Sequence, residues 1–166
     1  MKKIYCMFFL VFIANLTGQD VLAILKSVQN NHTLHMRHLQ QPFVCKPYGV
    51  ETLSELEMRT DTNSSCKQSI DLFRQENPQE KYFAVSILKI EQQYSVESIQ
   101  GLCMLHLSSA HSYSEALLEK GYALVSSAMI KDDEVLEQRF KKALLRAKKT
   151  KAGIWSDTDV RNCFRQ

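Results

Sequence analysis

The 166-residue chain lacks the features that mark several classes of protein. It has no apolar run long enough to span a bilayer comfortably, no Cys-X-X-Cys pair, no internal repeat and no low-complexity linker. These absences disfavour a membrane span and a cysteine-based metal site, and they favour a single domain. A large excess of one charge is also missing. The net charge of +3 falls to +1 without Lys2 and Lys3, which argues against nucleic-acid binding driven by the overall charge of the protein.

The first residues have the pattern of a signal peptide. Lys2 and Lys3 precede an apolar run over residues 4–14, and Gly18 offers a small residue for cleavage. The pattern predicts a signal peptide over residues 1–18 and one mature domain over residues 19–166, periplasmic or secreted, with no membrane span after cleavage. Cleavage after Ala23 also fits but would cut into the first expected strand, and an uncleaved N-terminal anchor remains the alternative.

Four cysteines remain in the expected mature domain: Cys45, Cys66, Cys103 and Cys163. An even number in an exported chain predicts two disulfides, and four cysteines allow three connectivities. Because no two of them are close in the sequence, disulfides are favoured over a metal site. Neither a bound metal nor a cofactor is expected.

Hydrophobic periodicity and turn residues predict a mixture of strands and helices. Strands are expected over residues 21–26, 33–36, 43–45, 82–90 and 101–107. Capping boxes at residues 65–68 and 112–115 begin two helices, and Asp132 or Asp133 caps a third. The predicted order is three strands, a helix, two strands and two helices.

The C-terminal segment is the most specific part of the sequence. Its last helix carries an apolar stripe of Leu136, Phe140, Ala143, Leu144 and Ala147. Gly153 is expected to end this helix, and Trp155, the only tryptophan, is expected to anchor it structurally. A basic helix ending in Gly-Ile-Trp-Ser resembles the closing helix of the staphylococcal-nuclease-like (thermonuclease) family, and residues 101–105 and 115–125 resemble the segments that precede it.

The resemblance implies an α+β fold, a five-stranded OB-type β-barrel carrying three helices. The third and fifth strands are neighbours in such a barrel, which implies a disulfide between Cys45 and Cys103. Cys66 is then left to pair with Cys163, although the other connectivities stay open.

The resemblance also places altered residues at the catalytic positions. Active members hold a divalent cation with aspartates and stabilise the transition state with arginines. Here Asn31 and Glu51 stand where aspartates are expected, and Lys46 and Gln100 stand where arginines are expected. Loss of catalysis is the expectation, since a hard cation needs oxygen ligands and a charged transition state needs fixed cationic donors.

The histidines offer no obvious replacement for those residues. His32, His35 and His38 are evenly spaced, but alternation along a strand would put His35 on the opposite face from the other two. We expect them to be ordinary exposed histidines. His106 and His111 have no evident partner in the sequence.

The basic run from Arg139 to Lys151 contains seven basic residues and no acid, and its simplest explanation is the solvated face of a helix. The candidate binding residues on one flank are Arg139, Lys142, Arg146 and Lys149. Because no aromatic residue interleaves them, a protein partner is favoured over nucleic acid.

The sequence therefore predicts an exported, catalytically degenerate nuclease-like domain, a pseudoenzyme that acts as a binding module. The alternative is a secreted nuclease, a cation-dependent phosphodiesterase with rearranged active-site residues.

Overall fold

The computed structural model describes residues 20–60 and 64–164, so the expected signal peptide lies outside the described residues. The strands are β1 (Asp20–Val28), β2 (Leu34–His38), β3 (Gln41–Cys45), β4 (Val50–Thr52), β5 (Gln93–Ile99), β6 (Leu102–Ser108), β7 (His111–Ser112) and β8 (Ala123–Val125). The helices are α1 (Leu53–Arg59), α2 (Ser65–Glu76), α3 (Pro78–Lys81), α4 (Phe83–Ile87), α5 (Tyr113–Glu119), α6 (Ser127–Ile130), α7 (Glu134–Thr150), a 3-10 turn (Gly153–Ser156) and α8 (Thr158–Cys163). None of the helices in these two ranges is long and apolar enough to span a membrane.

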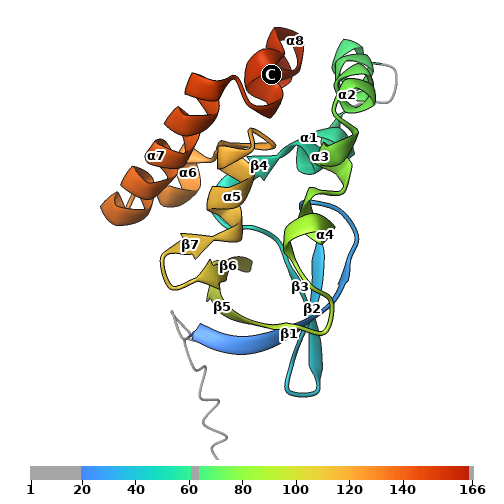
Figure 1. Ribbon diagram of the computed structural model, residues 1–166. Coiled ribbons are helices and arrows are strands. Elements are labelled where there is room, and N and C mark those ends of the chain that lie inside the picture. The colour runs from blue at the N-terminus through green and yellow to red at the C-terminus, as the bar shows by residue number, and fades with distance from the viewer. Residues whose placement is uncertain (1–19, 61–63, 165–166) are drawn as a thin grey trace, which may run out of the picture.

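The main sheet is antiparallel throughout, with the strand order β3-β2-β1-β5-β6-β7, and β4 pairs separately with β8. The sheet curves at one end of the molecule, and most of the helices gather at the other end (Figure 1). The α+β class is therefore as predicted. The eight α-helices exceed the three expected, because several single-turn helices occupy segments that carry no clear periodicity.

The sheet does not close into the expected five-stranded barrel. Its two sides approach each other only where the chain after β3 meets β6: the Tyr48 N–H donates to the Cys103 carbonyl (2.9 Å), and the Cys103 N–H donates to the Lys46 carbonyl (2.8 Å). Pro47 lies between these bonds and pairs with Cys103 in a single parallel bridge. The contact is an isolated bridge and does not extend into a ladder.

Two disulfides brace this arrangement, and they are the two pairs expected from the resemblance. Cys45 is bonded to Cys103, which joins β3 to β6 beside the isolated bridge. Cys66 is bonded to Cys163, which joins α2 to α8 near the C-terminus.

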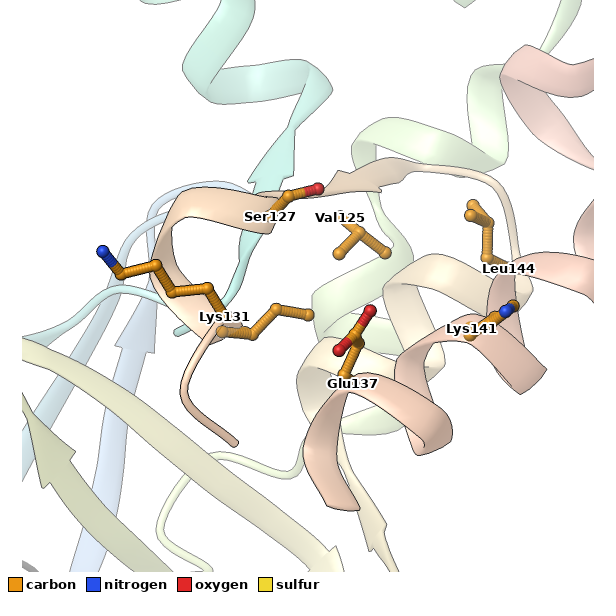
Figure 2. A pocket seen from close by; sticks show the side chains of 7 residues that line it. Val125, Ser127, Lys131, Glu137, Lys141 and Leu144 are labelled. Atoms are coloured by element: carbon orange, nitrogen blue, oxygen red, sulfur yellow. The ribbon is translucent and has the colours of Figure 1, made fainter. Parts of the chain in front are cut away.

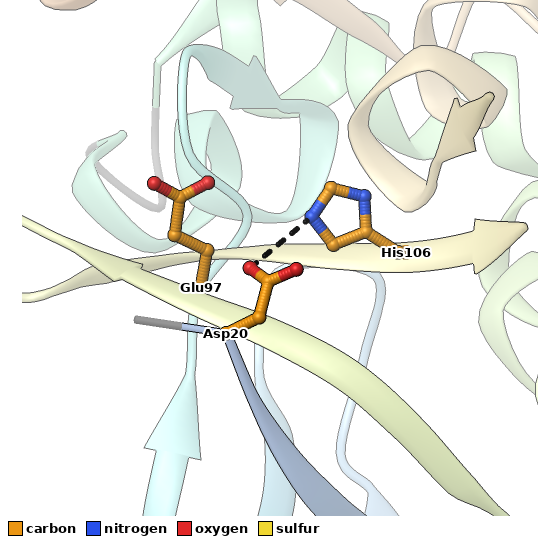
Figure 3. Close-up of side chains that lie close together, drawn as sticks. All are labelled: Asp20, Glu97 and His106. Atoms are coloured by element: carbon orange, nitrogen blue, oxygen red, sulfur yellow. Dashed lines mark ion pairs between the residues drawn. The ribbon is translucent and has the colours of Figure 1, made fainter. Parts of the chain in front are cut away.

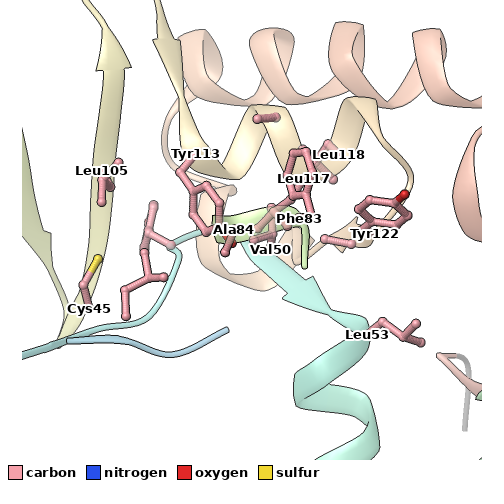
Figure 4. Close-up of a cluster of buried hydrophobic side chains, with 14 of the residues drawn as sticks. Cys45, Val50, Leu53, Phe83, Ala84, Leu105, Tyr113, Leu117, Leu118 and Tyr122 are labelled. Carbon is pink, nitrogen blue, oxygen red and sulfur yellow. The ribbon is translucent and has the colours of Figure 1, made fainter. Parts of the chain in front are cut away.

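The expected strand over residues 82–90 is wrong, because this segment forms α4 and the strand follows at β5. Its residue Phe83 enters the core: the centre of the Phe83 ring lies 5.3 Å from that of Tyr122, edge to face, and 6.4 Å from that of Tyr113, stacked. These rings lie next to Leu117 and Leu118 of α5 (Figure 4). Tertiary packing has overridden the local strand propensity. The other four strands and the three longer helices are confirmed within a few residues.

The last helix packs as predicted through Leu136, Phe140, Ala143 and Ala147, but Leu144 is only half-buried. It ends at Thr150, with Lys151 in the left-handed conformation (φ 50°), rather than at Gly153. Trp155 is half-buried, and the Lys148 ammonium lies 4.7 Å from the centre of its ring. Its position beside Gly121 fits the structural role expected for it.

Gly153 has a different role, which is close approach of two chain segments. Its φ is +53°, and the Ile154 N–H donates to the Gly121 carbonyl (2.9 Å). A Cβ at Gly153 would lie 2.4 Å from that carbonyl oxygen and 2.5 Å from that of Lys120. The absence of a side chain allows the C-terminal segment to dock on the end of α5.

We therefore expect Gly153→Ala to lower the free energy of unfolding by about 3 kcal/mol or more, because it adds a backbone clash to the left-handed penalty. Gly101→Ala is the matched control: Gly101 has a φ of +80° but open space around its Cβ position, so about 1 kcal/mol is expected. Urea denaturation of both variants measures the difference. Equal losses would contradict the docking role of Gly153.

Candidate functional site

Asn31, at the position of an expected ligand aspartate, is used by the fold itself. It lies in the turn between β1 and β2, is 1% exposed, and donates from Nδ2 to the main-chain oxygen of Glu80 (2.6 Å) and to its carboxylate (2.9 Å). Its Oδ1 accepts the N–H of Ala84 (2.9 Å), and its carbonyl accepts the hydroxyl of Tyr113 (3.0 Å). The amide oxygen that could have reached a cation is therefore already bonded.

The partner of Asn31 belongs to a buried ionic network. The Glu80 carboxylate is fully buried and accepts a hydrogen bond from Arg74 Nε (2.8 Å). Arg74 also contacts the carboxylate of Glu57 on α1, which accepts a second hydrogen bond from Lys67 (2.7 Å). Burial would raise the pKa of Glu57, but the bonds from Lys67 and Arg74 outweigh it and hold that pKa below its usual range. The sequence carried no local signal for this network, because its members come from separate helices.

The structure does not join the other three altered positions by hydrogen bonds or ion pairs with one another. Glu51 is ion-paired with Arg59 at the end of α1, and burial raises the pKa of the Glu51 carboxyl although Arg59 acts against it. Lys46 is exposed, and Gln100 is exposed in the turn between β5 and β6. No hydrogen bond or ion pair within residues 20–60 and 64–164 links any two of Asn31, Lys46, Glu51 and Gln100.

His32 differs from the expectation of an exposed histidine. Its side chain is 7% exposed, and its Nδ1 lies 3.5 Å from the Glu55 carboxylate on α1. Burial lowers the pKa of His32; Glu55 opposes that effect and Lys46 adds to it, so the ring is held neutral at pH 7. The sequence missed this pair because its members lie on different elements. Glu55 is close to the altered positions, and its own N–H is bonded to the Thr52 hydroxyl (3.0 Å).

Two of the four candidate binding residues on α7 are neutralised by acids of α5. Arg139 donates to both oxygens of Glu115 (3.0 and 2.6 Å), and Arg146 donates to Glu119 (2.6 Å). Burial would raise the pKa of Glu115, but Arg139 and the capping bonds of Ser112 lower it overall. His111 lies 3.7 Å from Glu119 and so has a partner that the sequence did not show.

The other two candidates, Lys142 and Lys149, are exposed and have no ion pair among the described residues. Lys142 lines a pocket of about 350 Å³ together with Arg139, Arg146 and the acids of α5. The structure thus brings three of the four candidates together and leaves the fourth, Lys149, further along α7.

A second pocket of about 370 Å³ opens on the other flank of α7, against α6 and β8. Its apolar lining includes Val125, Ile130 and Leu144, and its charged residues include Glu137 and Lys141 (Figure 2). Lys131 also belongs to this lining. The pocket combines an apolar floor with a polar edge, an arrangement suited to an apolar side chain of a partner.

The role of Asn31 in the fold can be tested by giving it the carboxylate that active members carry. We expect Asn31→Asp to lower the free energy of unfolding by about 3 kcal/mol, because two donated hydrogen bonds are lost and a second carboxylate faces buried Glu80. Asn30→Asp is the control: Asn30 Oδ1 only accepts, from the N–H groups of His32 (2.9 Å) and Thr33 (2.8 Å), so little change is expected. Thermal and urea unfolding would contradict the assignment if the two variants behaved alike.

Comparison with known proteins agrees with this architecture. A search of curated proteins gave no match. A family model described as staphylococcal nuclease homologue matches residues 46–157, about two thirds of the chain. That range includes three of the four altered positions, and the fourth, Asn31, precedes it. The chain belongs to the staphylococcal nuclease family.

Proposed function

We propose that this chain is a catalytically degenerate member of its family, exported and acting as a binding module for a protein partner. The proposed loss of catalysis rests on Asn31, which is buried and hydrogen-bonded through both the nitrogen and the oxygen of its side-chain amide. A residue fixed in this way contributes to the stability of the fold and offers nothing to a substrate.

The residues present do not fit the divalent cation of active members. A hard cation needs several oxygen ligands in reach of one point. The side-chain amide of Asn31 is hydrogen-bonded to Glu80, and the Glu51 carboxylate is ion-paired with Arg59. With no arginine at Lys46 or Gln100, the developing charge of a phosphoryl transition state would also lack its bidentate donors.

The outer face of α7 is the proposed binding surface. It presents the unpaired Lys142 and Lys149 beside two exposed apolar side chains, Val135 (70% exposed) and Leu145 (55% exposed). Apolar side chains among a few unpaired lysines suit a protein surface with an apolar centre and acidic neighbours. A phosphate backbone would need more unpaired positive charge than this face retains, because Arg139 and Arg146 are already neutralised.

Export is supported by the two disulfides, which are typical of chains that fold in an oxidising compartment. The periplasm or the extracellular medium provides such a compartment.

The alternative, a nuclease with rearranged residues, is favoured by one observation, the pair formed by buried His32 and half-buried Glu55. A neutral imidazole beside a carboxylate is a possible general base for a water nucleophile. The experiment below therefore includes a variant of His32.

We expect no hydrolysis of single-stranded DNA or RNA by the oxidised protein in calcium, magnesium or manganese, compared with an EDTA control and an active family member assayed in parallel. The reason is the absence of a ligand set and of arginine donors. Cation-dependent cleavage that is lost in His32→Gln would refute the proposal and establish the alternative. Cleavage that persists in His32→Gln would also refute the proposal, and it would place the catalytic base of the nuclease at a residue other than His32.

Nucleic-acid binding is expected to be weak, indifferent to sequence and steeply dependent on salt, since only phosphate contacts are available to α7. Oligonucleotide binding measured at several salt concentrations tests this, with Lys142→Glu and Lys149→Glu combined as the variant. Lys81→Glu and Lys89→Glu combined are the matched charge control away from α7, because both lysines are exposed and have no ion pair among the described residues. Submicromolar affinity at physiological salt, lost only in the α7 variant, would make nucleic acid the partner.

A further inference from the structure

We propose that Asp20, Glu97 and His106 form a binding site for a divalent transition metal of the zinc class. The three side chains lie on β1, β5 and β6, which are adjacent in the sheet, and they point toward one another (Figure 3). One carboxylate oxygen from each acid and one imidazole nitrogen all lie within 4.8 Å of one another.

The strand register brings the two acids together. Asp20 and Glu97 are direct partners across β1 and β5, so two carboxylates of like charge face each other on the same side of the sheet. Such pairs destabilise an antiparallel sheet. Within the described residues, the only ion pair that either acid forms is that of Asp20 with His106, whose Nε2 lies 4.0 Å from the Asp20 carboxylate. A cation between the carboxylates would convert this repulsion into attraction.

His106 supplies the third ligand from the next strand. It lies diagonally opposite Glu97, since Ser95 is its own partner on β5 and Met104 is the partner of Glu97. Its Nε2 is buried and makes no hydrogen bond to a described residue, although a buried ring nitrogen normally has a partner. The His106 side chain is 22% exposed, so neighbouring residues hold its ring in place. The Asp20 side chain is 58% exposed, so a cation can reach the site from solvent on that side.

The ligand types select the class of metal. Two carboxylate oxygens and an imidazole nitrogen suit zinc, whereas magnesium and calcium prefer oxygen ligands alone. Ligands of a tetrahedral zinc lie about 3.4 Å apart, so these three side chains need to close by about 1 Å. Rotation of exposed Asp20 and of Glu97 provides that movement, and water fills the fourth position.

The site is separate from the altered catalytic positions. Asp20 begins β1, and Asn31 lies beyond the opposite end of the same strand. Bound metal would fasten the start of β1 to β5 and β6. This inference does not depend on the proposed function, because it uses none of the same residues. Nothing in the sequence indicates the cluster, since its three members are far apart along the chain and follow no metal-binding spacing.

The test uses the purified, oxidised, metal-free protein without an affinity tag. Zinc is titrated by calorimetry and by competition with a chromophoric chelator, and thermal unfolding is recorded with and without zinc. We expect one saturable zinc per chain, an affinity lowered about tenfold or more by His106→Gln or Glu97→Gln, and weaker responses to magnesium and calcium than to zinc. Without metal, Glu97→Gln should be at least as stable as the parent, because it removes the like-charge pair.

His35→Gln and Glu51→Gln are the matched controls, since they remove a histidine elsewhere in the sheet and the carboxylate at a catalytic position; both should bind zinc as the parent does. The inference is overturned if the parent shows no saturable binding, if His106→Gln binds as well as the parent, or if calcium or magnesium binds in preference to zinc. Loss of binding in Glu51→Gln but not in Glu97→Gln would also overturn it, and would instead place a cation at the catalytic positions.

Discussion

The burial of one carboxylate, that of Glu80, organises the region where the turn between β1 and β2 meets three helices. A fully buried charge is stable only when it is paired and hydrogen-bonded. Arg74 and the amide of Asn31 meet this need, and the same two residues draw α1, α2, α3 and the β1–β2 turn toward one point. Asn31 is thereby fixed in the fold by hydrogen bonds through both atoms of its amide.

Charged side chains also form structural ion pairs elsewhere in the chain. Arg59 is paired with Glu51, and Arg139 and Arg146 of α7 are paired with acids of α5. Cationic groups that could act on a phosphate therefore hold helices in place. The outer face of α7 retains Lys142 and Lys149, which have no ion pair among the described residues, beside the exposed side chains of Val135 and Leu145.

The C-terminal segment shows how far stability depends on contacts between remote residues. Gly121 and Gly153 allow two turns to meet backbone to backbone, and the Cys66–Cys163 bond joins α8 to α2. The Cys45–Cys103 bond supports the isolated bridge between Pro47 and Cys103. The sheet therefore stays open while its two sides remain connected.

The sequence alone determined the features that depend on local pattern. The apolar stripe of α7, the capping box of α5 and four of the five expected strands follow from residue spacing, and the resemblance near Trp155 identified the family. Tertiary structure decided the rest, because the deciding contacts join residues far apart in the chain. Residues 83–87 form a helix, in which the Ala84 N–H donates to Asn31 and the Phe83 ring packs against two tyrosine rings. His32 is buried beside Glu55. Asp20, Glu97 and His106 come together only through the register of the strands.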